Sequence, residues 1–270
     1  LIGGTDAALE LVRGALDAGQ HVVTANKALI AEHGAALFEL AAEKGVQLRF
    51  EAAIAGGIPI VKAVREGLSG NRIEGIAGII NGTSNFILTE MSGLGNRGFD
   101  EVLAEAQELG YAEADPTFDV EGIDAAHKLT ILSSIAFGVP LAFEHIYTEG
   151  ISAVTVDDIR YAQELGYRLK HLGITRRRES GVELRVHPTL VPETELIAKV
   201  DGVMNAVLVS SDAAGTTLYY GAGAGSLPTA SSVVADVIDV ARSVGATHAV
   251  SNLGFAGGTS DARGLPIDET

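Results

Sequence analysis

Two short strand-like segments joined by one helix-like segment constrain the fold of this chain most. Residues 21–26 (HVVTAN) and 46–52 (VQLRFEA) have the β-branched composition of strands. Residues 27–44 favour a helix, which we expect Gly34 to break. Such tight strand–helix–strand spacing predicts a βαβ unit with parallel strands. We therefore predict that residues 1–50 are the last part of a doubly wound α/β domain.

The pattern changes after residue 50. Residues 51–220 mix helices with strands that dominate from residue 172 on, and they predict an α+β domain with a largely antiparallel sheet. One of its helices is expected at 155–170. Residues 221–244 contain a final helix that we expect to return to the first domain. Residues 245–270 lose periodicity and are predicted to be a linker.

Composition excludes several classes of protein. The charge balance of 19 basic and 35 acidic residues gives −16, which disfavours binding to nucleic acid. The absence of cysteine excludes disulfides and thiolate zinc sites. No apolar run approaches the roughly 20 residues of a membrane span, and no signal peptide is visible, so we expect a cytoplasmic protein.

The richest stretch for chemistry is residues 111–129, YAEADPTFDVEGIDAAHKL, where five carboxylates precede Lys128. Asp124 and Lys128 are four residues apart on a predicted helix and share one face. In one interpretation they form a solvated ion pair worth a few tenths of a kcal/mol. In the other, carboxylates bind a substrate ammonium while Lys128 transfers a proton. Burial lowers the pKa of a lysine and carboxylates raise it, and the sequence leaves that balance open.

Five segments resemble one enzyme family in its own order along the chain. They are VVTANKALI (22–30), FEAAIAGGIPIV (50–61), GIINGTSNFILTEM (78–91), LGYAEADPTFDVEGIDAAHKL (109–129) and GAGAGSLPTASSVVADVIDVAR (221–242). The family is homoserine dehydrogenase. The resemblance implies a Rossmann-type nucleotide-binding domain followed by a catalytic and dimerisation domain. It also implies reversible reduction of L-aspartate semialdehyde to L-homoserine with NADPH or NADH, a step of threonine, methionine and isoleucine biosynthesis.

The resemblance also implies roles for individual residues. Lys128 is expected to be the general acid/base, and Lys27 a second lysine that touches both cofactor and substrate. Glu113 and Asp124 are expected to bind the substrate, whose ammonium suits carboxylates. The remaining positions border the substrate (Gly82, Thr83, Tyr111) or the cofactor (Gly3, Gly225). Read locally, Lys27 is equally a surface lysine at a helix start, and Asn81–Asn85 is equally an N-cap cluster.

The segment 50–61 resembles the family's monovalent-cation loop, for Na⁺ or K⁺. Its expected ligands are oxygens: Glu51, by side chain or backbone, and the carbonyls of Ile54, Gly56 and Ile58. A hard cation accepts such oxygens whatever the side chains. Read locally, the same residues end a buried strand and form a glycine turn.

The glycine-rich fingerprint of a dinucleotide site is not predicted within this chain. Residues 221–225 (GAGAG) follow a strand, but Ser226 occupies the last slot of G-x-G-x-x-G and no βαβ unit follows. We expect the fingerprint upstream of residue 1, as in an internal fragment that also lacks any C-terminal regulatory domain. Such a fragment alone is expected to bind NADP(H) poorly, and the preference for NAD or NADP is not readable from it.

Three other functions are compatible with parts of this pattern. A dehydrogenase that oxidises the aldehyde through a thioester needs a cysteine, and because these residues contain none, that function is excluded unless the cysteine lies outside them. An amino-acid dehydrogenase of similar build would form an oxo acid instead. A non-catalytic amino-acid-binding or oligomerisation module would bind without turnover. The strand-rich domain could pair subunits edge to edge, and the family resemblance implies a homodimer or a higher homo-oligomer.

Overall fold

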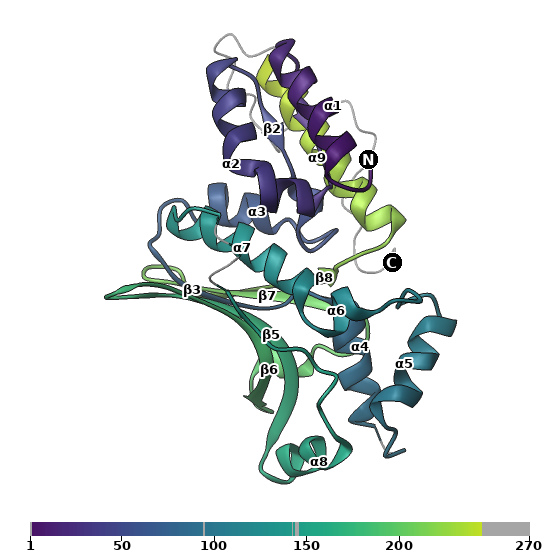
Figure 1. The fold of residues 1–270 in the computed structure, drawn as a ribbon. Helices are drawn as coiled ribbons and strands as arrows, with labels where there is room; N and C mark the ends of the chain where they lie inside the picture. The colour runs from purple at the N-terminus through teal and green to yellow at the C-terminus, as the bar shows by residue number, and fades with distance from the viewer. Residues whose placement is uncertain (1, 94, 142, 144–145, 245–270) are drawn as a thin grey trace, which may run out of the picture.

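The computed structural model describes residues 2–93, 95–141, 143 and 146–244 (Figure 1). The linker predicted at 245–270 therefore lies outside the described residues. Within the described part, no helix combines the length and the apolar character that crossing a membrane requires.

The N-terminal part contains the predicted parallel unit. Helix α1 (Asp6–Asp17) precedes β1 (Val22–Val23), helix α2 (Lys27–Glu43) and β2 (Leu48–Arg49). The strands β1 and β2 pair in parallel, with Val22 opposite Leu48. The last helix, α9 (Ser226–Val244), returns to this part of the molecule (Figure 1), where it contacts β1, although it is distant from it in the sequence.

The predicted break of this helix at Gly34 is wrong, because α2 runs continuously through it. A side chain at Gly34 would stand 2.9 Å from the Leu141 side chain. The glycine therefore allows close packing at a continuous helix rather than ending one. The helix begins at the capping residue Asn26, whose Oδ1 accepts the Leu29 N–H at 3.0 Å.

The second part is built on a six-stranded sheet in the order β4-β6-β5-β3-β7-β8. Every neighbouring pair is antiparallel except β4 and β6, so the predicted largely antiparallel sheet is confirmed. The strands are β3 (Ile73–Ile79), β4 (Tyr147–Thr148), β5 (Tyr167–Arg178), β6 (Gly181–Pro192), β7 (Met204–Ser211) and β8 (Gly215–Ala222).

The helix predicted at 155–170 is too long. Helix α8 (Val156–Glu164) starts at a capping box formed by Thr155 and Asp158. After it the chain turns at Gly166, whose φ is +80°, and continues as β5 from Tyr167. Pairing of β5 with β6 over twelve residues outweighs the local helical pattern, because each paired residue adds ladder hydrogen bonds.

One layer of helices covers the sheet on the side of the N-terminal part (Figure 1). Helix α7 (Ile123–Phe137) packs its apolar residues against β5 and β6, and against α2 on its other side. Its second half is the apolar run that follows Lys128, and Leu129 and Leu132 are fully buried. The remaining elements are η1 (Glu51–Ala53), α3 (Ile60–Lys62), η2 (Ala63–Gly67), α4 (Gly82–Met91), α5 (Phe99–Glu108), α6 (Thr117–Val120) and η4 (Leu196–Lys199).

Candidate functional site

Two lysines from different parts of the chain share one buried carboxylate. Lys27 begins α2, whereas Asp124 and Lys128 lie one turn apart on α7. The Lys27 amine pairs with Oδ1 of Asp124, and the Lys128 amine lies 2.6 Å from Oδ2. Lys128 also donates to the carbonyl of Ile80 at 2.8 Å. The side chains of Asp124 and Lys128 are only 3% and 12% exposed, so the pair does not lie on a solvated helix face.

The charge state of Asp124 follows from these partners. Burial alone raises the pKa of a carboxyl group, but the charges of Lys128 and Lys27 outweigh it and hold the pKa of Asp124 well below its usual range. Asn81 Nδ2 also donates to Oδ2 at 2.9 Å, so both carboxylate oxygens have partners. Asp124 therefore remains an anion that fixes the two amines.

A second carboxylate, Asp119, extends this cluster. Asn81 Nδ2 donates to its Oδ1 at 2.7 Å, so one amide links Asp119 with Asp124. Burial raises the pKa of Asp119, and the Asn81 hydrogen bond opposes that rise. Our sequence reasoning gave no site role to Asp119 or Asn81. The sequence does contain a signal for Asp119, because this residue belongs to the acidic stretch that precedes Lys128.

The cluster forms one wall of a cavity of about 460 Å³. The cavity brings together eight of the predicted residues: Lys27, Gly82, Thr83, Tyr111, Glu113, Asp124, Lys128 and Gly225. Thr83 Oγ1 donates to the carbonyl of Tyr111 at 2.7 Å, which ties the start of α4 to the acidic loop. Glu113 is exposed at this wall, whereas Asp124 is buried. The local reading of Asn81–Asn85 as an N-cap cluster is confirmed, since Asn81 caps α4 and the residues after it form the first turn of that helix.

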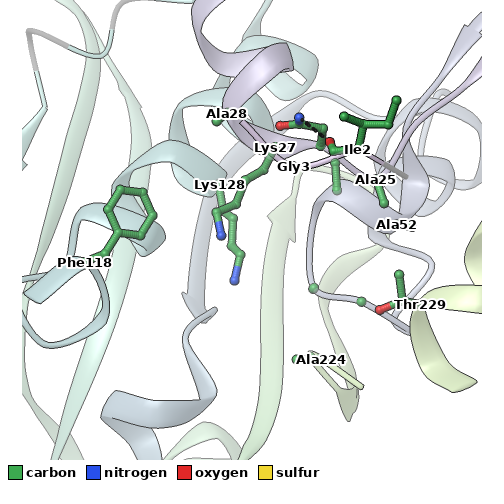
Figure 2. A pocket seen from close by; sticks show the side chains of 15 residues that line it. Ile2, Gly3, Ala25, Lys27, Ala28, Ala52, Phe118, Lys128, Ala224 and Thr229 are labelled. Carbon is green, nitrogen blue, oxygen red and sulfur yellow. Dashed lines mark hydrogen bonds between the residues drawn. The ribbon is translucent and has the colours of Figure 1, made fainter. Parts of the chain in front are cut away.

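A second cavity of about 530 Å³ adjoins the first. It shares Lys27 and Lys128 with the first cavity, and Figure 2 shows the two amines pointing into the same space. The predicted cofactor residue Gly3 lines it, together with Gly56 and Phe118. Its walls are largely small or apolar residues, which suits a flat ring.

Asn26 holds the N-terminal segment against this second cavity. Its Nδ2 donates to the carbonyls of Ile2 at 3.1 Å and Gly4 at 2.7 Å, while its Oδ1 caps α2. One side chain thus fixes Gly3 in the cavity wall beside Lys27. Sequence reasoning missed this role, and its only signal was an asparagine directly before a predicted helix.

The glycine-rich segment 221–225 contributes residues to the lining of both cavities. Gly223 lines both, and a side chain there would run into the Asn205 amide. A side chain at Gly56 would meet the Gly223 carbonyl in turn. The segment is glycine-rich because two backbones and one buried amide meet here, a reason unrelated to the dinucleotide fingerprint.

The predicted cation loop is buried beside the cavities. Both carboxylate oxygens of Glu51 accept backbone N–H groups, from Val61 at 2.8 Å and Lys62 at 2.9 Å. Burial raises the pKa of Glu51, and these two hydrogen bonds oppose the rise. The carbonyl of Gly56 accepts the Ser232 hydroxyl at 2.7 Å. Ile54 and Ile58 are buried in the core, and no cluster of acidic or histidine side chains suited to a metal occurs among the described residues.

Comparison with known families gives two adjoining matches. Residues 2–51 match the NAD-binding domain of homoserine dehydrogenase, and residues 59–238 match homoserine dehydrogenase itself. The chain is 69% identical over 244 residues to the homoserine dehydrogenase of Pseudomonas aeruginosa, covering 90% of this chain and 56% of that protein. It is 61% identical over 272 residues to that of Neisseria gonorrhoeae, covering 100% and 62%.

Solved structures give the same result. The crystal structure of a homoserine dehydrogenase from Thiobacillus denitrificans superposes with a TM-score of 0.87 at 69% identity, covering 89% of this chain and 56% of that one. A hyperthermophilic archaeal homoserine dehydrogenase in complex with NADPH superposes with a TM-score of 0.78 at 31% identity, covering 90% and 70%. The chain thus spans about 56 to 62% of the length of the two bacterial relatives named above.

Proposed function

The chain belongs to the homoserine dehydrogenase family, and we propose that the whole protein catalyses the reversible, NAD(P)-dependent reduction of L-aspartate semialdehyde to L-homoserine. The observation that carries this proposal is the pair of lysines on Asp124, at the junction of two cavities. Such a junction suits a reaction in which two ligands meet at one reacting carbon. The reaction is a step of threonine and methionine biosynthesis.

The two cavities suit two different ligands. We assign the cavity lined by Gly3 and Phe118 to the nicotinamide end of the dinucleotide, and the one lined by Thr83 and Glu113 to the amino-acid substrate. A bound nicotinamide supplies or accepts the hydride at the reacting carbon. The chain's own residues exclude water, orient the substrate and move the proton.

Lys128 is the proton donor in this proposal. Its amine opens onto both cavities, and it gives a proton to the substrate oxygen as the carbonyl becomes an alcohol. In the reverse direction it takes the proton back. The Lys27 amine lies on the other oxygen of Asp124 and stabilises the same developing negative charge.

The carboxylates divide between positioning and binding. Asp124 already binds two amines and Asn81, so we assign it to positioning Lys27 and Lys128. Glu113 is exposed at the cavity and suits the substrate ammonium. This division modifies the expectation that Asp124 and Glu113 both bind the substrate.

We also propose that the loop 51–58 binds a monovalent cation, Na⁺ or K⁺, through backbone carbonyls. The Glu51 carboxylate is used by two N–H groups, so the ligands are carbonyl oxygens such as those of Ile54, Gly56 and Ile58. A carbonyl has two lone pairs, so that of Gly56 can accept the Ser232 hydroxyl and still contact a cation. Thermal unfolding in potassium, sodium and choline chloride at equal ionic strength tests this, because specific binding raises Tm beyond the choline value.

The test of the main proposal is homoserine-dependent reduction of NADP⁺ or NAD⁺ by the whole protein, followed by absorbance of the reduced nucleotide. Product analysis must find the semialdehyde, since an amino-acid dehydrogenase would form an oxo acid and release ammonia. Binding of homoserine by calorimetry without turnover would favour a non-catalytic amino-acid-binding module. Sedimentation of the same preparation tests the proposed homodimer or larger homo-oligomer.

A further inference from the structure

A buried amide without a partner lies in the substrate cavity. Asn205, on β7, is 1% exposed, and its Oδ1 has no hydrogen-bond partner among the described residues. It is the only strongly polar side chain in the apolar stretch VMNAVLV (203–209). Buried polar atoms in native proteins are nearly always paired, so an unpaired one at a cavity wall points to a ligand.

The position of this oxygen is set by the start of helix α4. A side chain at Gly82 would stand 2.7 Å from the Val203 carbonyl and 3.7 Å from Asn205 Oδ1. The missing side chain of Gly82 therefore leaves a space beside two acceptors, and all three residues line the cavity. Nothing larger than glycine fits there without moving the Val203 backbone.

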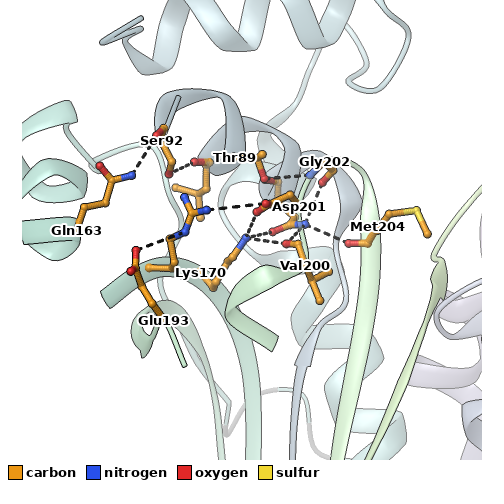
Figure 3. Close-up of polar contacts among 12 residues, drawn as sticks. Thr89, Ser92, Gln163, Lys170, Glu193, Val200, Asp201, Gly202 and Met204 are labelled. Carbon is orange, nitrogen blue, oxygen red and sulfur yellow. Dashed lines mark hydrogen bonds and ion pairs between the residues drawn. The ribbon is translucent and has the colours of Figure 1, made fainter. Parts of the chain in front are cut away.

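A buried lysine network fixes the segment that carries these acceptors. Lys170, 2% exposed, donates to the carbonyl of Val200 at 2.6 Å and to Asp201 Oδ1 at 2.9 Å (Figure 3). Asn85, on α4, donates to the carbonyls of Val200 and Gly202. The segment leading into β7 is thus tied to α4, and the acceptors keep a fixed distance from the helix start.

A site for an α-amino acid needs hydrogen-bond donors and acceptors side by side, because the carboxylate and the ammonium are attached to the same carbon. The N–H groups of Gly82 and Thr83 have no acceptor within their own helix and favour a carboxylate. The capping oxygen, Asn81 Oδ1, accepts the N–H of Ser84 and not those of Gly82 and Thr83. The carbonyl of Val203 and Asn205 Oδ1 supply acceptors for the ammonium.

We propose that Asn205 is a substrate-binding residue whose Oδ1 accepts a hydrogen bond from the substrate's α-ammonium group, alongside the Val203 carbonyl. This inference rests on the proposed function and adds a neutral recognition element to it. An amide suits the position because it accepts a hydrogen bond without adding charge beside Asp119 and Asp124.

The experiment uses the whole protein with Asn205→Ala and Asn205→Asp, and Tm measured for each to confirm folding. We expect Asn205→Ala to raise the homoserine KM roughly ten- to hundredfold, as loss of one hydrogen bond to a charged group does, with the Kd for NADPH unchanged. Asn205→Asp keeps the Oδ1 acceptor and the side-chain shape but adds a negative charge to a cavity that already contains Asp119 and Asp124, so its homoserine KM should rise less than that of Asn205→Ala.

Two inhibitors separate recognition of the ammonium from general damage. L-2-aminobutyrate keeps the ammonium and lacks the hydroxyl, whereas 4-hydroxybutyrate lacks the ammonium. The alanine variant should lose affinity for the first and keep its response to the second. An unchanged homoserine KM in Asn205→Ala, equal weakening for both inhibitors, or a KM increase in Asn205→Asp as large as that in Asn205→Ala overturns the inference. These results leave the proposed function intact, whereas wild-type protein without homoserine-dependent turnover overturns both.

Discussion

Lys27 and Lys128 meet at a single carboxylate, one amine on each oxygen of Asp124. Two positively charged amines repel each other at this distance, and the negative charge of Asp124 between them compensates that repulsion. The arrangement keeps two amines at the boundary of two cavities, on a carboxylate that is itself buried. The chemistry that we propose depends on this three-residue unit.

Replacement of Lys128 by alanine should lower kcat far more than it changes the homoserine KM. Positioned proton transfer contributes on the order of 10²- to 10⁴-fold, and it acts only in the transition state. Steady-state kinetics of the whole protein measure this. The matched control is Lys44→Ala, since Lys44 pairs with Asp17 at the surface and should leave kcat unchanged. A proportional loss in the control would assign the effect to surface charge.

Replacement of Glu113 by glutamine should weaken homoserine binding by about tenfold and leave the Kd for NADPH unchanged, because only the substrate carries an ammonium. Calorimetric titration with each ligand measures the two effects separately. Glu108→Gln, an exposed position on helix α5, serves as the control for loss of one negative charge. Equal weakening of both ligands would count against a specific contact with the substrate.

Replacement of Gly223 by alanine should impair both ligands together. The new methyl group would run into the Asn205 amide, and the backbone of Gly223 also lies against Gly56. Overpacking of this kind costs about 1–3 kcal/mol and displaces the wall between the cavities. Chemical denaturation and kinetics measure the loss. The control is Gly14→Ala in helix α1, where a methyl group meets nothing and should stabilise by about 0.5–1 kcal/mol.

Replacement of Asp124 by asparagine should destabilise the protein at neutral pH and matter less in acid. The folded-state pKa of Asp124 is lowered, so its stabilisation is present above the unfolded pKa of about 3.9 and is lost as pH falls below it. The difference in free energy of unfolding between wild type and variant should therefore shrink below about pH 4. Denaturation at a series of pH values measures the difference, and a pH-independent gap would contradict the charge argument.

Replacement of Lys170 by methionine should loosen the segment 200–204. The lysine has a pKa lowered by burial, and Asp201 opposes that shift, so its amine is held inside by its acceptors. Without it, the Val200 carbonyl keeps only the Asn85 donor and Asp201 loses its charged partner, and loss of hydrogen bonds from a charged group costs about 1.5–3 kcal/mol. Hydrogen exchange should show faster exchange in residues 200–204. The exposed Lys199→Met is the control, and equal effects of both variants would exclude a specific network.

Local patterns along the sequence predicted several features correctly. The strand–helix–strand spacing of residues 21–52 indicated the parallel unit, and the antiparallel sheet followed from the strand-rich second half. The helix pairing of Asp124 with Lys128 followed from their spacing of four. The individual helices and strands and the i,i+4 ion pair depend on near neighbours in the sequence, which residue order alone specifies.

The tertiary structure decided the rest. Lys27 contacts Asp124 because α2 packs on α7, and no local pattern reports which helices pack together. Residues 167–170 became a strand because β6 pairs with them, and Gly34 lies inside the continuous helix α2, where the Leu141 side chain packs close to it. Asn205 faces the cavity because the sheet places β7 beside the start of α4. The sequence by itself determined the elements and the i,i+4 ion pair, whereas long-range packing decided which side chains share a cavity.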